Sequence, residues 1–162
     1  MIKSEIINLF QSLQKLGNLS GVKFAYAVSR NIAILKPEVE ALNKALEGSD
    51  EFKQFDEKRV ELAKKHAKKD DKNKPLVNRG QFEIENQEAF DAEFETLKSE
   101  HQEVWDARQK QVDDYNDLLK TESELQLYKV SLTDVPVNIT VAQMHSISDI
   151  VTEEITSPFP VK

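Results

Sequence analysis

The stretch AYAVSRNIAILKPEVEALNKAL, residues 25–46, carries apolar residues at alternating spacings of three and four. These positions are Ala25, Val28, Ile32, Leu35, Val39, Leu42 and Leu46. A run of this spacing over about three heptads is typical of a helix whose single apolar seam faces a partner, as in a coiled coil. Pro37 lies inside the run and has no amide hydrogen to donate, so we expect a kink or a break near residues 35 and 36.

Residues that end or break helices are sparse, with four glycines and five prolines among 162 residues. Gly48 is expected to end the first helix and Ser49 to cap a lysine-rich helix over residues 50–69. Asn86 is expected to cap a longer helix over residues 87–120, which would measure roughly 50 Å at 1.5 Å per residue. We therefore expect this helix either to protrude as one arm of a long antiparallel coiled-coil hairpin or to bend.

Shorter helices are expected at both ends of the chain. Residues 1–16 have an apolar stripe at helical spacing, which predicts a helix that packs on the core. Thr140 and Gln143 form the pattern of a capping box, which predicts a last, short helix over residues 141–153.

Two segments, residues 81–85 and 125–132, alternate in polarity and are predicted as short strands that pair with each other or rest on helices. The predicted fold is α+β and predominantly α. It has a long antiparallel helical hairpin, a small two-stranded β element and a short C-terminal helix. We expect a single helical domain over residues 1–155 and a flexible tail over residues 156–162.

The composition narrows the function classes. The chain has no cysteine, which excludes disulfides, thiolate metal sites and cysteine nucleophiles. Residues 1–16 interleave apolar and charged side chains and lack the continuous apolar core of a signal peptide or a membrane span. We therefore expect a cytosolic protein with no membrane partner.

The net charge of −7 is unevenly distributed. Residues 80–124 hold fourteen acidic and four basic residues, whereas lysines concentrate over residues 58–74. Two helices of opposite charge are expected to attract each other across solvent. The candidate interaction residues are Glu93, Glu100 and Asp114 on the acidic helix and Lys64 and Lys68 on the lysine-rich one.

The charged helices suggest two opposite relations to nucleic acid. Lysines on one face can bind phosphate, but acids are interleaved with them and few aromatic residues lie nearby to stack on bases, so we do not expect direct nucleic-acid binding. Conversely, a rod with acids along one side can imitate the charge of a duplex. An acidic inhibitor of a host DNA- or RNA-binding protein is therefore an alternative function.

His66 and His101 are the candidates for a metal site, because both fall on or beside the apolar seams of helices that are expected to pair. A zinc site needs a third ligand, and neither helix has the spacing that places two ligands on one face. A metal-dependent hydrolase is the second alternative. Our leading expectation is that the protein has no catalytic residue, no cofactor and no bound metal.

Three stretches have a distinctive layout: ELAKKHAKKD at residues 61–70, FEIENQEAF at 82–90, and LYKVSLTDVP at 127–136 followed by ITVAQM at 139–144. Together they resemble a family of small, uncharacterised proteins of tailed bacteriophages. The resemblance implies a phage accessory or assembly protein that works in the cytoplasm of a bacterial host. No reaction is assigned to that family, so no catalytic residue carries over.

The leading expectation is therefore a non-enzymatic phage accessory or assembly protein that acts through protein–protein interaction. The partner is expected to be a phage or host protein. The apolar seam of residues 25–46 and the long helix from residue 87 would expose apolar stripes without a covering helix, so we also expect a homo-oligomer.

Overall fold

A computed structural model of the chain describes residues 1–153, and the flexible tail predicted for residues 156–162 lies outside this range. The chain forms two compact units. We call residues 1–45, with the described residues from 115 onward, the terminal unit, and residues 46–114 the middle unit. The single domain expected over residues 1–155 stays a prediction.

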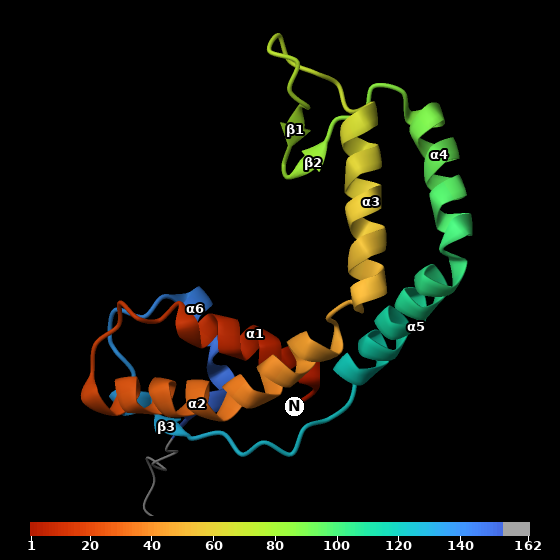
Figure 1. The fold of residues 1–162 in the computed structure, drawn as a ribbon. Coiled ribbons are helices and arrows are strands. Elements are labelled where there is room, and N and C mark those ends of the chain that lie inside the picture. The colour runs from red at the N-terminus through yellow and green to blue at the C-terminus, as the bar shows by residue number, and fades with distance from the viewer. Residues whose placement is uncertain (154–162) are drawn as a thin grey trace, which may run out of the picture. The chain divides into compact units, whose positions relative to one another are not determined.

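A helical hairpin forms the main part of the terminal unit (Figure 1). In it, α1 (Lys3–Gln14) lies along α2 (Val22–Ala45). The largest apolar cluster of the described residues contains Ile6, Leu9, Leu13, Leu16, Leu19, Phe24, Ala27, Leu35, Val39, Val130, Val135, Ile147 and Ile150. The core-packing N-terminal helix and the predominantly helical fold with a helical hairpin are thus confirmed.

The seam predicted along α2 is right in its second half and displaced by one residue in its first half. The buried residues of α2 are Phe24, Ala27, Asn31, Leu35, Val39 and Leu42. Ala25, which starts the predicted seam, is exposed, and Val28 and Ile32 are half-buried. The helix is rotated in this way because burying the aromatic ring of Phe24 removes more apolar surface from water than burying Ala25.

The helix α2 continues through Pro37, so the predicted break near residues 35 and 36 is wrong. Leu35 and Val39 flank the proline in sequence and are both buried. Packing of this face stabilises the helix enough to offset the hydrogen bond that Pro37 cannot donate. The predicted alternative, a kink, stays a prediction.

The short helix α6 (Val141–Ser146) packs on α1 and is followed by the 3-10 helix η2 (Ser148–Ile150). The predicted capping box is confirmed. Thr140 Oγ1 accepts a hydrogen bond from the amide of Gln143 at 3.2 Å, and Gln143 Oε1 accepts one from the amide of Thr140 at 2.9 Å. These bonds satisfy amides that the first turn of a helix leaves free.

Beyond Ser146 the predicted helix over residues 141–153 is wrong, because the chain turns to bury Ile147 and Ile150 and then forms a strand. That strand, β4 (Val151–Thr152), pairs in parallel with β3 (Val130–Ser131). The 3-10 helix η1 (Leu132–Asp134) follows β3. The strand predicted over residues 125–132 is thus confirmed only at β3.

Asn31 is buried inside the terminal unit and is the only buried polar residue among residues 1–153. Its Nδ2 donates to the carbonyl oxygens of Ala27 at 3.0 Å and Tyr128 at 2.8 Å. Its Oδ1 accepts from the amide of Tyr128 at 2.8 Å. The side-chain amide therefore bonds both backbone groups of Tyr128 and fixes the segment before β3 on α2.

The middle unit contains α3 (Asp50–His66), a hairpin of β1 (Val77–Asn78) and β2 (Gln81–Phe82), and then α4 (Gln87–Glu100) and α5 (Gln102–Leu119), the last of which extends beyond it. The helices α3 and α4 begin where the sequence predicts. Ser49 accepts from the amide of Phe52 and Asn86 from that of Ala89, so both predicted N-caps are confirmed.

The strand predicted over residues 81–85 is confirmed only at β2, and its partner is β1 and not residues 125–132. Arg79 and Gly80 form the two-residue turn with φ of 49° and 81°. Positive φ at both positions defines the turn whose twist matches an antiparallel pair. Because β1 is a partner close in sequence, β2 does not pair with the other predicted strand.

The helix predicted over residues 87–120 is interrupted at His101, where φ is −120° and ψ is 32°. Of the two predicted alternatives, an extended arm and a bend, the structure has the bend. The sequence there contains no glycine or proline, so the interruption arises from packing.

We predict that Asn31→Leu destabilises the terminal unit by about 2–4 kcal/mol, because it leaves the amide and carbonyl of Tyr128 without their partner. Chemical unfolding followed by circular dichroism measures the change. Ser29→Ala, at an exposed position of the same helix, is the control and should change stability by less than about 0.5 kcal/mol. An Asn31→Leu variant as stable as the control would contradict the role of this side chain.

Candidate protein-interaction surface

An aromatic cluster holds the three helices of the middle unit together around Phe55. The ring of Phe55 lies 6.4 Å from Phe94 of α4 and 5.8 Å from Trp105 of α5, measured between centroids. The ring of His101 lies 5.9 Å from it in an edge-on arrangement. Phe55 itself is buried, so α3, α4 and the start of α5 form one packed frame.

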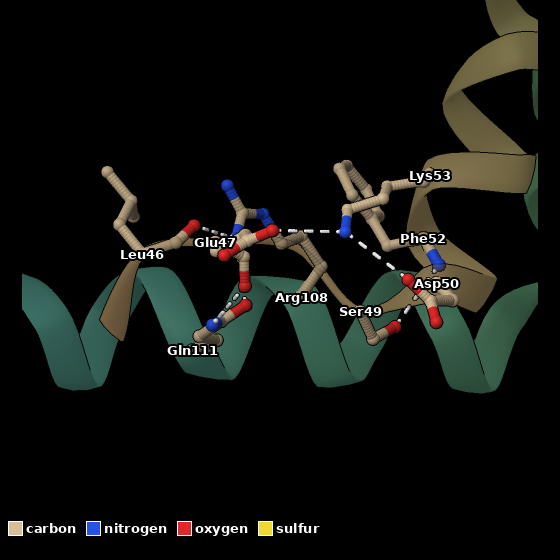
Figure 2. A network of polar contacts seen from close by, with 8 residues as sticks. All are labelled: Leu46, Glu47, Ser49, Asp50, Phe52, Lys53, Arg108 and Gln111. Carbon is tan, nitrogen blue, oxygen red and sulfur yellow. Dashed lines mark hydrogen bonds and ion pairs between the residues drawn. The ribbon is translucent and has the colours of Figure 1, made fainter. Parts of the chain in front are cut away.

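The same frame extends to the loop that precedes α3 (Figure 2). Arg108 Nη1 donates to the carbonyl oxygen of Leu46 at 2.7 Å, and Gln111 Nε2 donates to that of Glu47 at 2.9 Å. The guanidinium of Arg108 also lies over the ring of Phe52, 4.9 Å from its centroid. Two side chains of α5 thus fix the backbone from which α3 starts.

A lysine completes this network at the first turn of α3. Lys53 Nζ lies 3.1 Å from Glu47 Oε1 and 3.2 Å from Asp50 Oδ1. The hydrogen bond to Glu47, followed by the one to Asp50, raises the pKa of Lys53. These are exposed pairs, so their role is to orient the loop more than to add stability.

The helices α3 and α4 run antiparallel. His66, at the end of α3, contacts Phe90 near the start of α4, whereas Lys58 contacts His101 just beyond the end of α4. Along one side of this helix pair runs an open groove of about 450 Å³. We call it the α3–α4 groove.

The α3–α4 groove has an apolar floor between a rim on α3 that contains two lysines and an acidic rim on α4. Leu62 and Leu97, both half-buried, provide apolar surface from α3 and α4. Lysines 58 and 65 stand on the α3 side, and glutamates 93 and 100 stand on the α4 side. The α3 rim also contains Glu61, which is ion-paired with Lys64 at 2.7 Å. Such a surface is suited to binding a helix or strand of complementary charge.

One ion pair crosses between the two rims. Lys65 Nζ lies 2.6 Å from Glu93 Oε2, and His66 Nε2 lies 3.2 Å from Glu93 Oε1 without hydrogen-bond geometry. The hydrogen bond from Lys65 is the main cause that lowers the pKa of the Glu93 carboxyl, with a smaller contribution from His66. Glu93 is therefore held as a carboxylate on the groove rim.

Two of the five predicted interaction residues, Glu93 and Glu100, line the α3–α4 groove. Lys64 and Lys68 are not among its lining residues: Lys64 pairs with Glu61, and Lys68 lies beyond α3, where its backbone bonds Glu83. Asp114 is exposed on α5. The predicted set is thus dispersed over the middle unit.

Sequence reasoning missed Lys58 and Lys65 as groove residues, although a signal was present. Both lysines flank Leu62, four residues before it and three after it. Glu93 and Glu100 flank Leu97 in the same way. The spacing places each charge on the same helix face as its leucine.

Most acids of α4 and α5 do not pair with the lysines of α3. Among residues 1–153, Glu93 is the only acid between positions 88 and 117 that forms an ion pair with α3. Glu95 and Asp117 pair with lysines of their own helix or its end. The mutual neutralisation expected of the two helices is therefore limited to one site, and the acidic face remains solvated.

The two histidines lie at different ends of the α3–α4 pair. His66 is beside Phe90 and Glu93, while His101 is beside Phe55 and Lys58, with 2.9 Å between its Nε2 and the lysine Nζ. Among residues 1–153 no three His, Cys, Asp or Glu side chains are grouped as metal ligands would be. The metal-dependent hydrolase stays a prediction.

Comparisons of the chain with models of protein families, with curated proteins and with solved structures found no match. Within the described residues 1–153, no helix has the length and apolar character needed to cross a membrane.

We predict that Phe55→Ala costs the middle unit about 3–5 kcal/mol, the usual loss for a truncated buried aromatic ring. Trp105 is the only tryptophan of the chain and lies against Phe55, so its fluorescence reports unfolding of this unit directly. Gln54→Ala, at an exposed position of α3, is the matched control. Equal midpoints for the two variants in a urea titration would show that Phe55 does not hold the helices together.

We predict that the carboxyl of Glu93 titrates below the usual range of a glutamate and that Lys65→Met raises its pKa. Because the pKa is lowered in the folded state, Glu93 stabilises the fold above the ordinary glutamate pKa of about 4.3 and loses this contribution as the pH falls. NMR titration of the side-chain carboxyl measures the value. Lys64→Met, which removes the partner of Glu61, should leave Glu93 unchanged.

Proposed function

We propose that the protein is a non-enzymatic interaction protein and that the α3–α4 groove is its binding surface. One observation carries the proposal: an apolar floor, formed by Leu62 and Leu97, lies between a basic rim and an acidic rim. An apolar centre with a charged border is the common anatomy of a protein interface. The aromatic frame around Phe55 holds both rims in place, so the surface is formed before a partner arrives.

The biological setting of this proposal is that of a phage accessory or assembly protein in the cytoplasm of a bacterial host. Its support is the resemblance of residues 61–70, 82–90 and 127–144 to small proteins of tailed bacteriophages. An accessory or assembly protein would work through contacts with phage or host proteins, which agrees with a groove as the site. The proposal includes self-association of the chain.

A second candidate function, an acidic inhibitor of a host DNA- or RNA-binding protein, is favoured by the solvated acids of α4 and α5. Asp91, Glu95 and Asp106 are exposed, and among residues 1–153 none of them forms an ion pair with α3. A summed negative field of this kind attracts a basic surface quickly and in a salt-dependent way. The groove would not take part in such binding.

Two variants separate these functions in a pull-down from lysate of a bacterial host. The groove variant carries Leu62→Gln and Leu97→Gln, which make the floor of the α3–α4 groove polar. In the arm variant, Asp91, Glu95 and Asp106 are changed to lysine. We expect the groove variant to lose capture at least tenfold and the arm variant to keep it. Capture by the unmodified chain should persist at about half-molar salt, because salt screens interactions between charges and does not screen apolar contacts.

The opposite pattern would contradict the proposed function. Capture lost by the arm variant and by salt, yet retained by the groove variant, would establish the acidic inhibitor instead. Circular dichroism and Trp105 fluorescence of each variant verify that the helices and the aromatic frame are intact.

A further inference from the structure

The two helices of the α3–α4 groove carry the same pattern with opposite charge. On α3, Leu62 is preceded by Lys58 at four residues and followed by Lys65 at three. On α4, Leu97 is preceded by Glu93 and followed by Glu100 at the same intervals, which places each set on one helix face.

The antiparallel pairing sets the two patterns level with each other. Lys65 contacts Glu93, and Lys58 contacts His101, the neighbour of Glu100. At successive positions along the groove, Lys65 is thus beside Glu93, Leu62 beside Leu97, and Lys58 beside Glu100.

We propose that the partner of the α3–α4 groove is a second copy of this chain, bound about a twofold axis parallel to the helices. This proposal rests on the proposed function and names its partner. Rotation about such an axis places α3 of one copy on α4 of the other and leaves the position of each residue along the helix axes unchanged. The second copy then opposes Glu100 to Lys58, Leu97 to Leu62 and Glu93 to Lys65.

The charges select this axis over its alternative. A twofold axis across the helices would place α3 on α3, with Lys58 of one copy against Lys65 of the other, and α4 on α4, with glutamate against glutamate. Like charges at both ends of each contact oppose that arrangement, whereas the parallel axis pairs opposite charges at all four ends. The product is a four-helix arrangement with the leucines at its centre.

The size of the surface sets the strength of the dimer. A face of two helices, each about 10 Å wide and, for the 14 residues of α4, about 21 Å long, covers roughly 400 Å² per copy. That is about half of a standard interface, so association should be weak and depend on concentration. We expect monomers at about 1 μM and a dimer that is half formed at about 100 μM.

Sedimentation equilibrium between about 1 μM and 1 mM tests the dimer. Lys58→Glu and Glu100→Lys should each weaken association at least tenfold, since each places like charges in contact twice. An equimolar mixture of these two variants should regain association, because each chain now supplies the charge that the other lacks. Lys110→Glu has the same charge change at an exposed position of α5 outside the groove lining and is the control.

Cysteine cross-linking tests the axis, and the absence of native cysteine makes the result unambiguous. Chains with Leu62→Cys mixed with chains with Leu97→Cys should form a disulfide-linked dimer faster than either variant alone. Faster linking of Leu62→Cys chains to one another would overturn the parallel axis. A monomer at 1 mM in every sample would overturn the second copy as partner.

These outcomes are separable from failure of the proposed function. A chain that stays monomeric but captures a lysate protein through Leu62 and Leu97 would leave the groove as a binding surface with a different partner. A chain that dimerises as described but captures nothing would support the second copy as the sole occupant of the groove.

Discussion

Contact of one ring, Phe55, with both α4 and α5 determines the shape of the middle unit. Phe94 and Trp105 are eleven residues apart, which in a straight helix is about 16 Å along the axis. Their ring centroids are nevertheless only 6.1 Å apart, and both lie against Phe55. No unbroken helix can satisfy these contacts, so the chain must turn between them, and it does so at His101.

The turn at His101 also decides which surfaces are covered. Beyond it, Val104 and Ala107 of α5 lie beside Phe52 at the start of α3, where Arg108 and Gln111 hold the preceding loop. In the later part of α3, His66 contacts Phe90 and Lys65 contacts Glu93, both of α4. Leu62 and Leu97 therefore remain accessible, and the α3–α4 groove is a direct result of how the aromatic residues pack.

Local features of the fold were predictable because they depend on neighbours in sequence. The caps at Ser49, Asn86 and Thr140 are examples, since each side chain accepts a hydrogen bond from an amide three residues away. The turn at His101 was not marked by glycine or proline. The phase of α2 was set by Phe24. The two predicted strands pair with β1 and with β4, neither of which was predicted as a strand. Of the site, Glu93 and Glu100 were named, but the level pairing with Lys58 and Lys65 requires knowledge of how α3 and α4 align.

The buried amide of Asn31 links the register of the segment before β3 to the helical state of α2. Residues 125–132 alternate in polarity, so a shift of one residue would exchange their inward and outward faces. Asn31 bonds the amide and the carbonyl of Tyr128 and thereby selects one of these two registers, with Val130 inward. This selection exists only once α2 is helical and positions the side chain. The register of the segment that leads into β3 therefore depends on α2 being helical, and a helix acts as the template for a strand.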